Sequence, residues 1–201
     1  MSWIKTINYT DAGTGLKKVY NRVKGPDNNI DNILKVHSLR PHSLTGHMTL
    51  YKNVIHNTNN VLPKWYLESI GVYVSFLNDC NYCVTHHFEG LKRILKNDLK
   101  ANSYLEAVKK DTLSEFFDSK NYKGMLYAKK LSLELSQMTE NDVITLRTSG
   151  FSDGEILEIN QVTSYFNYAN RTVLGLGVDL KGDILGLSPN DSSNPEQWNH
   201  Q

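Results

Sequence analysis

The stretch LNDCNYCVTHHFEGL, residues 77–91, contains both cysteines of this 201-residue chain. Cys80 and Cys83 are three positions apart, and His87 follows four positions after Cys83. Spacings of three and four residues place side chains on the same face of an α-helix. We therefore predict a helix that begins at the cysteines, runs to about Lys96 and carries the two thiols and the imidazole along one strip.

This set of side chains suits thiol redox chemistry. The start of a helix is the positive end of its dipole, which lowers the pKa of a thiol and increases the fraction of reactive thiolate. A histidine one turn away can accept or relay a proton, and two adjacent thiols can close to a disulfide and reopen. Free cysteines also occur as inert core residues. The combination of Cys80 and Cys83 with His87 favours the redox interpretation.

The segment before the cysteines, residues 62–78, predicts a helix that starts at Pro63. Its apolar side chains recur at helical spacing, at Leu67, Ile70, Val74 and Leu77. Glu68 is the only charged side chain between Trp65 and Asn78. Because an unpaired buried carboxylate is costly, Glu68 lies either at an exposed edge or inside the protein with a partner, as a catalytic base or proton relay would.

Further helix signals run along the chain, and no segment predicts a strand ladder. Asn78 and Asp79 predict a break and an N-cap for the cysteine helix. Two pairs have the spacing expected at a helix start: Thr139 with Asp142, and Ser152 with Glu155. Helices are also predicted over two ranges near the N-terminus, 11–24 and 41–57. The expected fold class is all-α, a compact helical bundle.

A single domain over residues 1–201 is expected, in four parts. These parts are an N-terminal arm and helix, 1–34, a motif-bearing helical half, 35–115, a second helical half, 116–180, and a polar C-terminal tail, 181–201. The tail is rich in Pro, Ser and Asn, which predicts a loose extension or an arm that packs on a neighbouring subunit. A shift of 90 residues aligns Glu158 with Glu68 and Asn170 with Cys80, which suggests an internal duplication.

Composition limits the range of functions. The chain has 22 basic and 21 acidic residues, so its net charge of +1 gives no sign of a partner such as nucleic acid or an anionic membrane. The first residues, MSWIKTINYT, do not have the pattern of a secretory signal, and no apolar run is long enough to span a membrane. We expect a cytoplasmic protein, in which a CxxC pair is typical of redox or metal chemistry.

The four residues Glu68, Cys80, Cys83 and His87, with their spacing, resemble the signature of the alkylhydroperoxidase D-like family, within the carboxymuconolactone decarboxylase superfamily. The flanking sequence is similar to the peroxidase-related branch over roughly residues 1–180. The resemblance implies an all-helical fold assembled as a homo-oligomer, a trimer or hexamer. It also implies a thiol-dependent peroxidase or disulfide reductase that needs no cofactor, metal or haem. Its partners would be a hydroperoxide substrate and a thiol or dithiol reductant.

The resemblance assigns roles by position. Cys83 corresponds to the thiol that attacks the peroxide, and Cys80 to the proton donor and resolving thiol. Glu68 and His87 correspond to the proton relay. The chain departs from the best-studied members at Tyr82, where they have a histidine, and a tyrosine is a poor base near neutral pH.

Two alternative functions remain open. A non-redox enzyme of the superfamily, such as a lactone decarboxylase, does not need a CxxC pair. A metal-binding module would use Cys80, Cys83 and His87, with Glu68 or His86 as a fourth ligand for Zn²⁺. Structural zinc sites usually take a second ligand pair from a distant segment, and the sequence has no second CxxC or HxxxH.

Other polar and aromatic residues are interpreted as structural. The remaining histidines share no motif: His37, His42, His47, His56, His86 and His200. Two of them, His47 and His56, lie on or near the preceding predicted helix, from which they can approach the site. The aromatic residues of the last helix are interpreted as core: Tyr165, Phe166 and Tyr168. Arg171 is the only charged residue from 159 to 178, which predicts a structural or subunit-interface ion pair.

Overall fold

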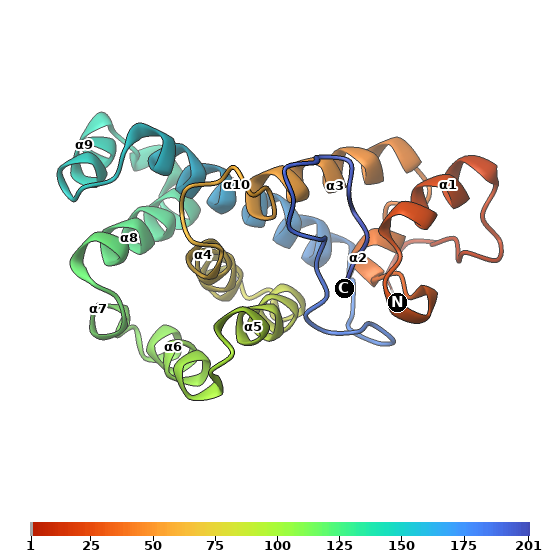
Figure 1. The fold of residues 1–201 in the computed structure, drawn as a ribbon, viewed down its shortest axis with the longest axis horizontal. Helices are drawn as coiled ribbons and strands as arrows, with labels where there is room; N and C mark the ends of the chain where they lie inside the picture. The colour runs from red at the N-terminus through yellow and green to blue at the C-terminus, as the bar shows by residue number, and fades with distance from the viewer. Residues whose placement is uncertain (1) are drawn as a thin grey trace.

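The computed structural model describes residues 2–201, which form ten α-helices and two short 3₁₀ helices (Figure 1). The α-helices are α1 (Thr14–Val23), α2 (Asn32–Lys35), α3 (Pro41–Ile55), α4 (Lys64–Leu77), α5 (Asn81–Leu95), α6 (Asp98–Lys110), α7 (Leu113–Phe116), α8 (Ser119–Leu133), α9 (Glu140–Thr148) and α10 (Asp153–Leu176). The 3₁₀ helices are η1 (Pro26–Asn28) and η2 (Leu135–Gln137). Over residues 2–201 the only β pairing is an isolated bridge between Pro189 and His200. The predicted all-α fold class is confirmed.

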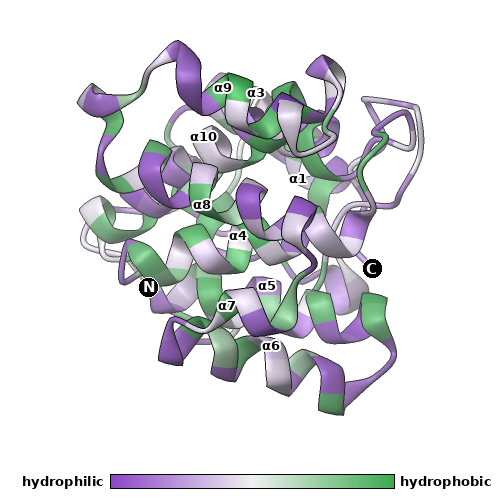
Figure 2. Ribbon diagram, turned by 90° about the vertical axis from the view of Figure 1, so that its left-hand side faces the viewer, coloured by the Kyte–Doolittle hydropathy of each residue, from purple (hydrophilic) through white to green (hydrophobic). Residues whose placement is uncertain are grey.

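Helix α4 is the centre of the bundle. Every residue from Tyr66 to Ser75 is buried, and the helix packs mainly on α5, α10 and α8 (Figure 1). Its ribbon is coloured largely as apolar, whereas polar segments gather on outer helices and loops (Figure 2). Gly71 allows α10 to approach closely, because a Cβ atom there would lie 2.2 Å from the ring of Phe166. A helix buried on all sides explains why its sequence is apolar around most of its circumference.

The turn between α4 and α5 differs from the prediction in one respect. Asp79 has φ of 54°, the left-handed conformation that ends α4, and does not cap the next helix. Cys80 is itself the N-cap of α5, with φ −87° and ψ 80°, and the helix begins at Asn81. Only three residues connect α4 to α5, so Cys80 occupies the position immediately before α5. Cys80 therefore lies at the edge of the helix, while Cys83 lies in its first turn.

The predicted helix starts in the second half are found. Capping boxes form at both predicted pairs, Thr139 with Asp142 and Ser152 with Glu155. The helix predicted over 11–24 is α1, and the helix predicted over 41–57 is α3. The 90-residue shift pairs the α4–α5 segment with α10, which runs without a break, and the duplication stays a prediction.

The C-terminal segment, residues 181–201, packs on its own chain. Trp198 is 1% exposed, and the guanidinium carbon of Arg22 lies 3.6 Å above its ring. Arg22 also pairs with the carboxylate of Glu196. In Figure 1 the segment runs beside α2 and α3. The prediction of a loose extension was wrong, because the tail contains apolar anchors that its polar composition obscured. Contact of the tail with a neighbouring subunit stays a prediction.

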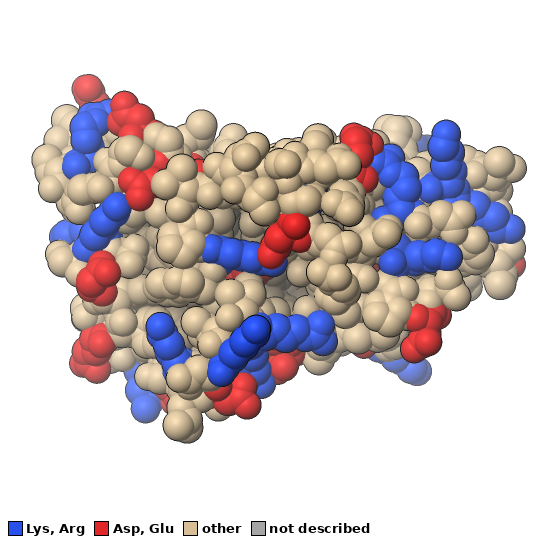
Figure 3. All heavy atoms as spheres, viewed as in Figure 1, with Lys and Arg blue, Asp and Glu red and all other residues tan. Residues whose placement is uncertain are grey.

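The surface has mixed charge. On the face shown in Figure 3, acidic and basic side chains are interspersed. None of the helices among residues 2–201 combines the length and the apolar character that a membrane span requires. Arg171 is exposed and donates to the backbone oxygen and side-chain oxygen of Asn167, at 2.9 and 2.7 Å. Within residues 2–201 Arg171 makes no ion pair, because its side chain lies at the surface. An ion pair across a subunit interface stays a prediction.

Candidate active site

The two cysteines lie together at the N-terminus of α5. Cys80 and Cys83 are 3.1 Å apart, and both are free thiols. Cys80 is fully buried and Cys83 is 3% exposed. The turn described above fixes this proximity, because an N-cap residue and the third residue of the same helix lie on one side of its first turn.

The surroundings of the two thiols differ. The pKa of Cys80 is lowered by a hydrogen bond from the Cys83 thiol, which outweighs the opposing effect of burial. The backbone N–H of Cys83 and the side chain of Asn170 also support a Cys80 thiolate. The pKa of Cys83 is raised well above the ordinary value by its hydrogen bond to Cys80 and by burial. When the pair loses one proton, the negative charge is therefore favoured on Cys80 and the remaining proton on Cys83.

Asn170 fixes the turn that carries the thiols. It is fully buried on α10, and its amide nitrogen donates to the hydroxyl of Ser75 at 3.0 Å. Its carbonyl oxygen accepts from the amide of Asn78 at 2.9 Å. The same side chain hydrogen-bonds to both thiols. The sequence contained one signal for this residue, the 90-residue shift that aligns it with Cys80, but that signal did not indicate contact.

Glu68 and His87 form the pair that the sequence motif predicted. Nδ1 of His87 donates to Oε2 of Glu68 at 2.8 Å. Burial raises the pKa of Glu68, but the charge and hydrogen bond of His87 outweigh it, so the pKa lies below its usual value. The ring of His87 also packs edge-on against Phe166, with centroids 4.6 Å apart. Glu68 thus holds the imidazole in the tautomer whose Nε2 is free to exchange a proton.

A further histidine, His56, lies between Glu68 and the half-exposed Asp191. Nε2 of His56 is 3.8 Å from Oε1 of Glu68, and its Nδ1 is 3.2 Å from Oδ1 of Asp191. Asp191 belongs to the C-terminal segment and is half exposed, and it pairs with Lys64 at 2.7 Å. Burial lowers the pKa of His56 despite the hydrogen bond of Asp191, so this imidazole is neutral at physiological pH. His56 was interpreted as structural from the sequence, but its imidazole lies next to the carboxylate of Glu68.

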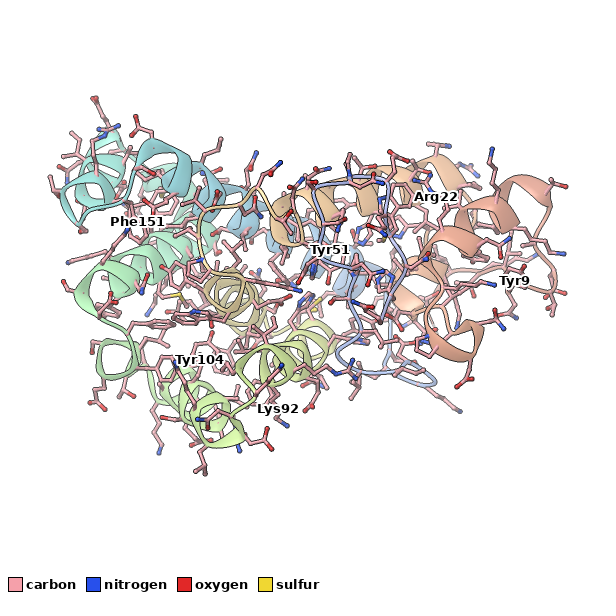
Figure 4. The ribbon with its side chains drawn as sticks, viewed as in Figure 1. Tyr9, Arg22, Tyr51, Lys92, Tyr104 and Phe151 are labelled. Carbon is pink, nitrogen blue, oxygen red and sulfur yellow. The ribbon has the colours of Figure 1, made fainter. Side chains whose placement is uncertain are left out.

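A cavity of about 40 Å³ lies next to these groups. Helices α2, α3, α4, α5 and α10 and the C-terminal segment all contribute to its wall, and Tyr51 of α3 marks its position in Figure 4. Of the four predicted site residues, Cys83, His87 and Glu68 line this cavity, whereas Cys80 lies behind Cys83. The structure thus brings all four predicted residues into one region and gives only one thiol access to the cavity.

Several wall residues were not predicted from the sequence. Asp31, at the start of α2, is 5% exposed, and burial raises its pKa to about 6. His47 and His200, both interpreted as structural, line the cavity from α3 and from the C-terminal segment. His47 is one of the two histidines that the sequence allowed to approach the site. Burial lowers the pKa of His47 to about 3 and that of His200 to about 4. These residues come from segments far apart in the chain, so no local pattern could have joined them.

Tyr82 and His86 form a second polar group at the same wall. The hydroxyl of Tyr82 donates to Oδ2 of Asp183 at 2.5 Å and accepts from the backbone N–H of Ile33 at 3.1 Å. Nε2 of His86 lies 3.3 Å from the same carboxylate oxygen. Burial raises the pKa of Tyr82, so its phenol stays protonated. The tyrosine that departs from the family pattern therefore anchors the C-terminal segment.

The described residues do not provide a metal centre. Within residues 2–201 no three His, Cys, Asp or Glu side chains are arranged to hold a metal ion together. Nδ1 of His87 is engaged with Glu68, and the nearest partner of each thiol is the other thiol. The arrangement supports proton transfer and thiol chemistry better than ligation.

Fold and site together define a helical protein with a buried dithiol and a carboxylate–histidine pair, and the fold is that of the alkylhydroperoxidase AhpD core. An uncharacterized peroxidase-related protein from Ralstonia eutropha JMP134, described as an alkylhydroperoxidase AhpD core, matches with a TM-score of 0.74 and 20% identity over 90% of this chain and 93% of its own. A peroxidase-related protein from Silicibacter sp. TM1040 matches with a TM-score of 0.66 and 23% identity over 75% of this chain and 76% of its own.

A third solved structure of the same fold is a debrominase. Bmp8 in complex with 2,3,4-tribromopyrrole matches with a TM-score of 0.70 and 15% identity, over 90% of this chain and 95% of its own. No family model matches the sequence. No curated protein is significantly similar to it either. The expected resemblance is confirmed at the level of the fold.

Proposed function

We propose that the protein is a thiol-dependent peroxidase in which Cys83 and Cys80 form the redox couple. One observation supports this most directly: Cys83 lines the cavity that His87 and Glu68 also line, and Cys80 lies 3.1 Å from it. An attacking thiol, a resolving thiol and a proton relay are the parts that dithiol reduction of a peroxide needs. The peroxidase-related neighbours of the same fold agree with this proposal.

The first step is attack on the peroxide. One proton of the dithiol passes to His87 and the other stays on Cys80. The thiolate of Cys83 then attacks the terminal, hydrogen-bearing oxygen of ROOH. The S–O bond forms, the O–O bond breaks, and Cys83 becomes a sulfenic acid. The departing RO⁻ takes a proton and leaves as ROH. His87, held by Glu68, donates or relays that proton.

The second step closes the disulfide. The sulfur of Cys80 attacks the sulfur of Cys83, so the S–S bond forms and the S–O bond breaks. The hydroxide leaves as water, and the two protons of the dithiol end in ROH and H₂O. The dithiol has lost two electrons and the peroxide has gained them. An external thiol or dithiol reductant then reopens the disulfide, as the redox proposal requires.

The alternatives have less support. A decarboxylase would leave the dithiol without a role, and the described residues offer no three-ligand metal group. The debrominase neighbour raises halogen removal as another reaction, but a ring with three bromine atoms is too large for a cavity of about 40 Å³.

We also propose a homo-oligomer in the cytoplasm. Exposed apolar side chains such as Leu133 and Leu135 are consistent with subunit contacts, and light scattering measures the subunit number.

The test is peroxide consumption with dithiothreitol in buffer that contains a chelator. Wild type should turn over many times, and Cys83→Ser should be inactive. Cys80→Ser should react once and yield a sulfenic acid that dimedone traps on Cys83. Equal inactivity of all three proteins would reject the peroxidase proposal. A sulfenic acid trapped on Cys80 in Cys83→Ser, and none on Cys83, would reverse the two roles.

A further inference from the structure

The cavity beside Cys83 is small. Its volume of about 40 Å³ is well below the roughly 150 Å³ of an engineered protein cavity that binds benzene. Hydrogen peroxide has only two non-hydrogen atoms and fits this space, whereas an aromatic hydroperoxide has a ring that does not. The space therefore limits which peroxides reach the sulfur.

The wall is also polar on more than one side. His47 and His200 are 3% and 8% exposed, and Nδ1 of each lacks a hydrogen-bond partner among residues 2–201. Both imidazoles are neutral near pH 7, because burial lowers their pKa values to about 3 and about 4. Buried polar atoms without partners are rare in folded proteins, and a small polar ligand beside them would supply the missing bonds. A molecule with hydroxyl groups at both ends suits these nitrogens better than one with an alkyl end.

The C-terminal segment forms one side of the cavity. Leu187, Ser188 and His200 contribute its part of the wall. Gly186, with φ of 74°, passes so close to α5 that a Cβ atom would lie 2.9 Å from the backbone of Glu89 and Gly90. No larger residue would let the segment lie there.

Polar contacts hold the segment at both ends of this stretch. Tyr82 donates to Asp183, and Arg93 donates to the backbone oxygen of Leu185 at 3.0 Å. Beyond Leu187, Lys52 donates to the backbone oxygen of Asn190. Hydrogen bonds to α5 and α3 therefore hold the segment on both sides of Leu187.

From the cavity volume, the unpartnered histidine nitrogens and the C-terminal wall, we propose that the substrate is hydrogen peroxide or a hydroperoxide of similar size. The side chain of Leu187 excludes bulkier organic hydroperoxides. This inference rests on the proposed peroxidase function and specifies its substrate class.

The first experiment compares hydrogen peroxide with cumene hydroperoxide at a fixed dithiol concentration. Wild type should consume hydrogen peroxide at least tenfold faster. Leu187→Ala should reduce that ratio several-fold, because it removes side-chain volume from the wall. Leu185→Ala, which changes the same residue type outside the cavity, should leave the ratio unchanged. Equal rates for both peroxides in wild type would overturn the size limit and leave the peroxidase function standing.

The second experiment needs no turnover. In Cys80→Ser protein, methyl methanethiosulfonate and benzyl methanethiosulfonate label the remaining Cys83, and mass spectrometry follows the rate. We expect the methyl reagent to react at least tenfold faster after correction for the rates with free cysteine. Equal corrected rates would overturn the size limit, whatever the peroxidase assay shows. If neither peroxide is consumed, the proposed function fails and hydrogen peroxide fails with it as substrate, while the labelling rates still decide the size limit.

Discussion

The carboxylate of Glu68 on α4 accepts a hydrogen bond of 2.8 Å from Nδ1 of His87 on α5. The two residues are 2% and 15% exposed in their side chains. A buried carboxylate bonded to one nitrogen of an imidazole orients the ring and fixes its tautomer. This pair is the part of the site on which the proton steps of the proposed reaction depend.

Glu68→Gln should lower the rate of peroxide reduction by about 100-fold, near the lower end of general acid–base effects. The amide keeps the shape of the side chain but removes the negative charge that lies beside the His87 ring. The measurement is kcat/KM for hydrogen peroxide from pH 5 to 9, since a purely structural role would not change the pH profile. Glu115→Gln, at an exposed position, is the control. Unchanged rate and profile in Glu68→Gln would remove the carboxylate from the mechanism.

Asn170→Ala should raise the pKa of Cys80, because the amide supports its thiolate. Ser75 and Asn78 also lose a buried partner, which costs about 1–3 kcal/mol of unfolding free energy. The pH dependence of iodoacetamide alkylation in a Cys83→Ser background reports the thiol pKa. The control is Asn167→Ala in the same background, which also removes a contact to Asn78. If both variants shift the thiol pKa equally, the effect comes from the turn and not from the amide.

Asp31→Asn should stabilise the protein at pH 8. Burial raises the pKa of this carboxyl from 3.8 to about 6, so the folded state prefers its neutral form. The cost to stability is absent below pH 3.8, grows as pH rises and is complete above about 6. A difference of about two between these pKa values corresponds to roughly 3 kcal/mol, an upper figure for the gain.

Urea unfolding at pH 4 and pH 8 measures this effect. The advantage of Asp31→Asn over wild type should be small at pH 4 and larger at pH 8. Glu68 should behave in the opposite sense, because its pKa is lowered and its contribution to stability is lost as pH falls through that pKa. Asp11→Asn, exposed on the surface, should show neither trend. A destabilised Asp31→Asn at pH 8 would show that the carboxylate has favourable partners in the folded state.

Trp198→Ala should destabilise the protein by about 3–5 kcal/mol, as expected for removal of a fully buried tryptophan. The indole contacts Arg22 and anchors the end of the C-terminal segment. Trp3→Ala removes a tryptophan that is 78% exposed and should cost less than about 1 kcal/mol. Thermal unfolding of both variants compares the two sites. Similar small losses would mean that the segment is loose in solution.

The spacing of the motif predicted the local part of the site well. Cys80, Cys83 and His87 lie within eight residues, and helical periodicity brings them together without help from the rest of the chain. The capping boxes that start at Thr139 and Ser152 could be predicted for the same reason, since a capping box joins two residues only three positions apart. The predicted N-cap at Asp79 was wrong because left-handed and capping conformations both favour Asp.

Sequence patterns did not predict which residues line the cavity together. His47, His200 and Asp31 come from three separate segments, and each resembles an ordinary polar residue in its local context. The C-terminal segment is polar in composition, yet a few residues such as Trp198 and Gly186 fix it on the bundle. The composition of a segment is an average over all its residues, whereas its packing on the helical bundle depends on a few individual residues.

The sequence by itself determined an all-helical chain and a dithiol beside a histidine, because helical spacing and capping act between residues a few positions apart. Only the tertiary structure decided that Glu68 meets His87, that Asn170 supports the thiols, and that the C-terminal segment forms one wall of a cavity of about 40 Å³ beside Cys83. These contacts join residues from different helices. They depend on how the helices pack, which is set by the whole core at once.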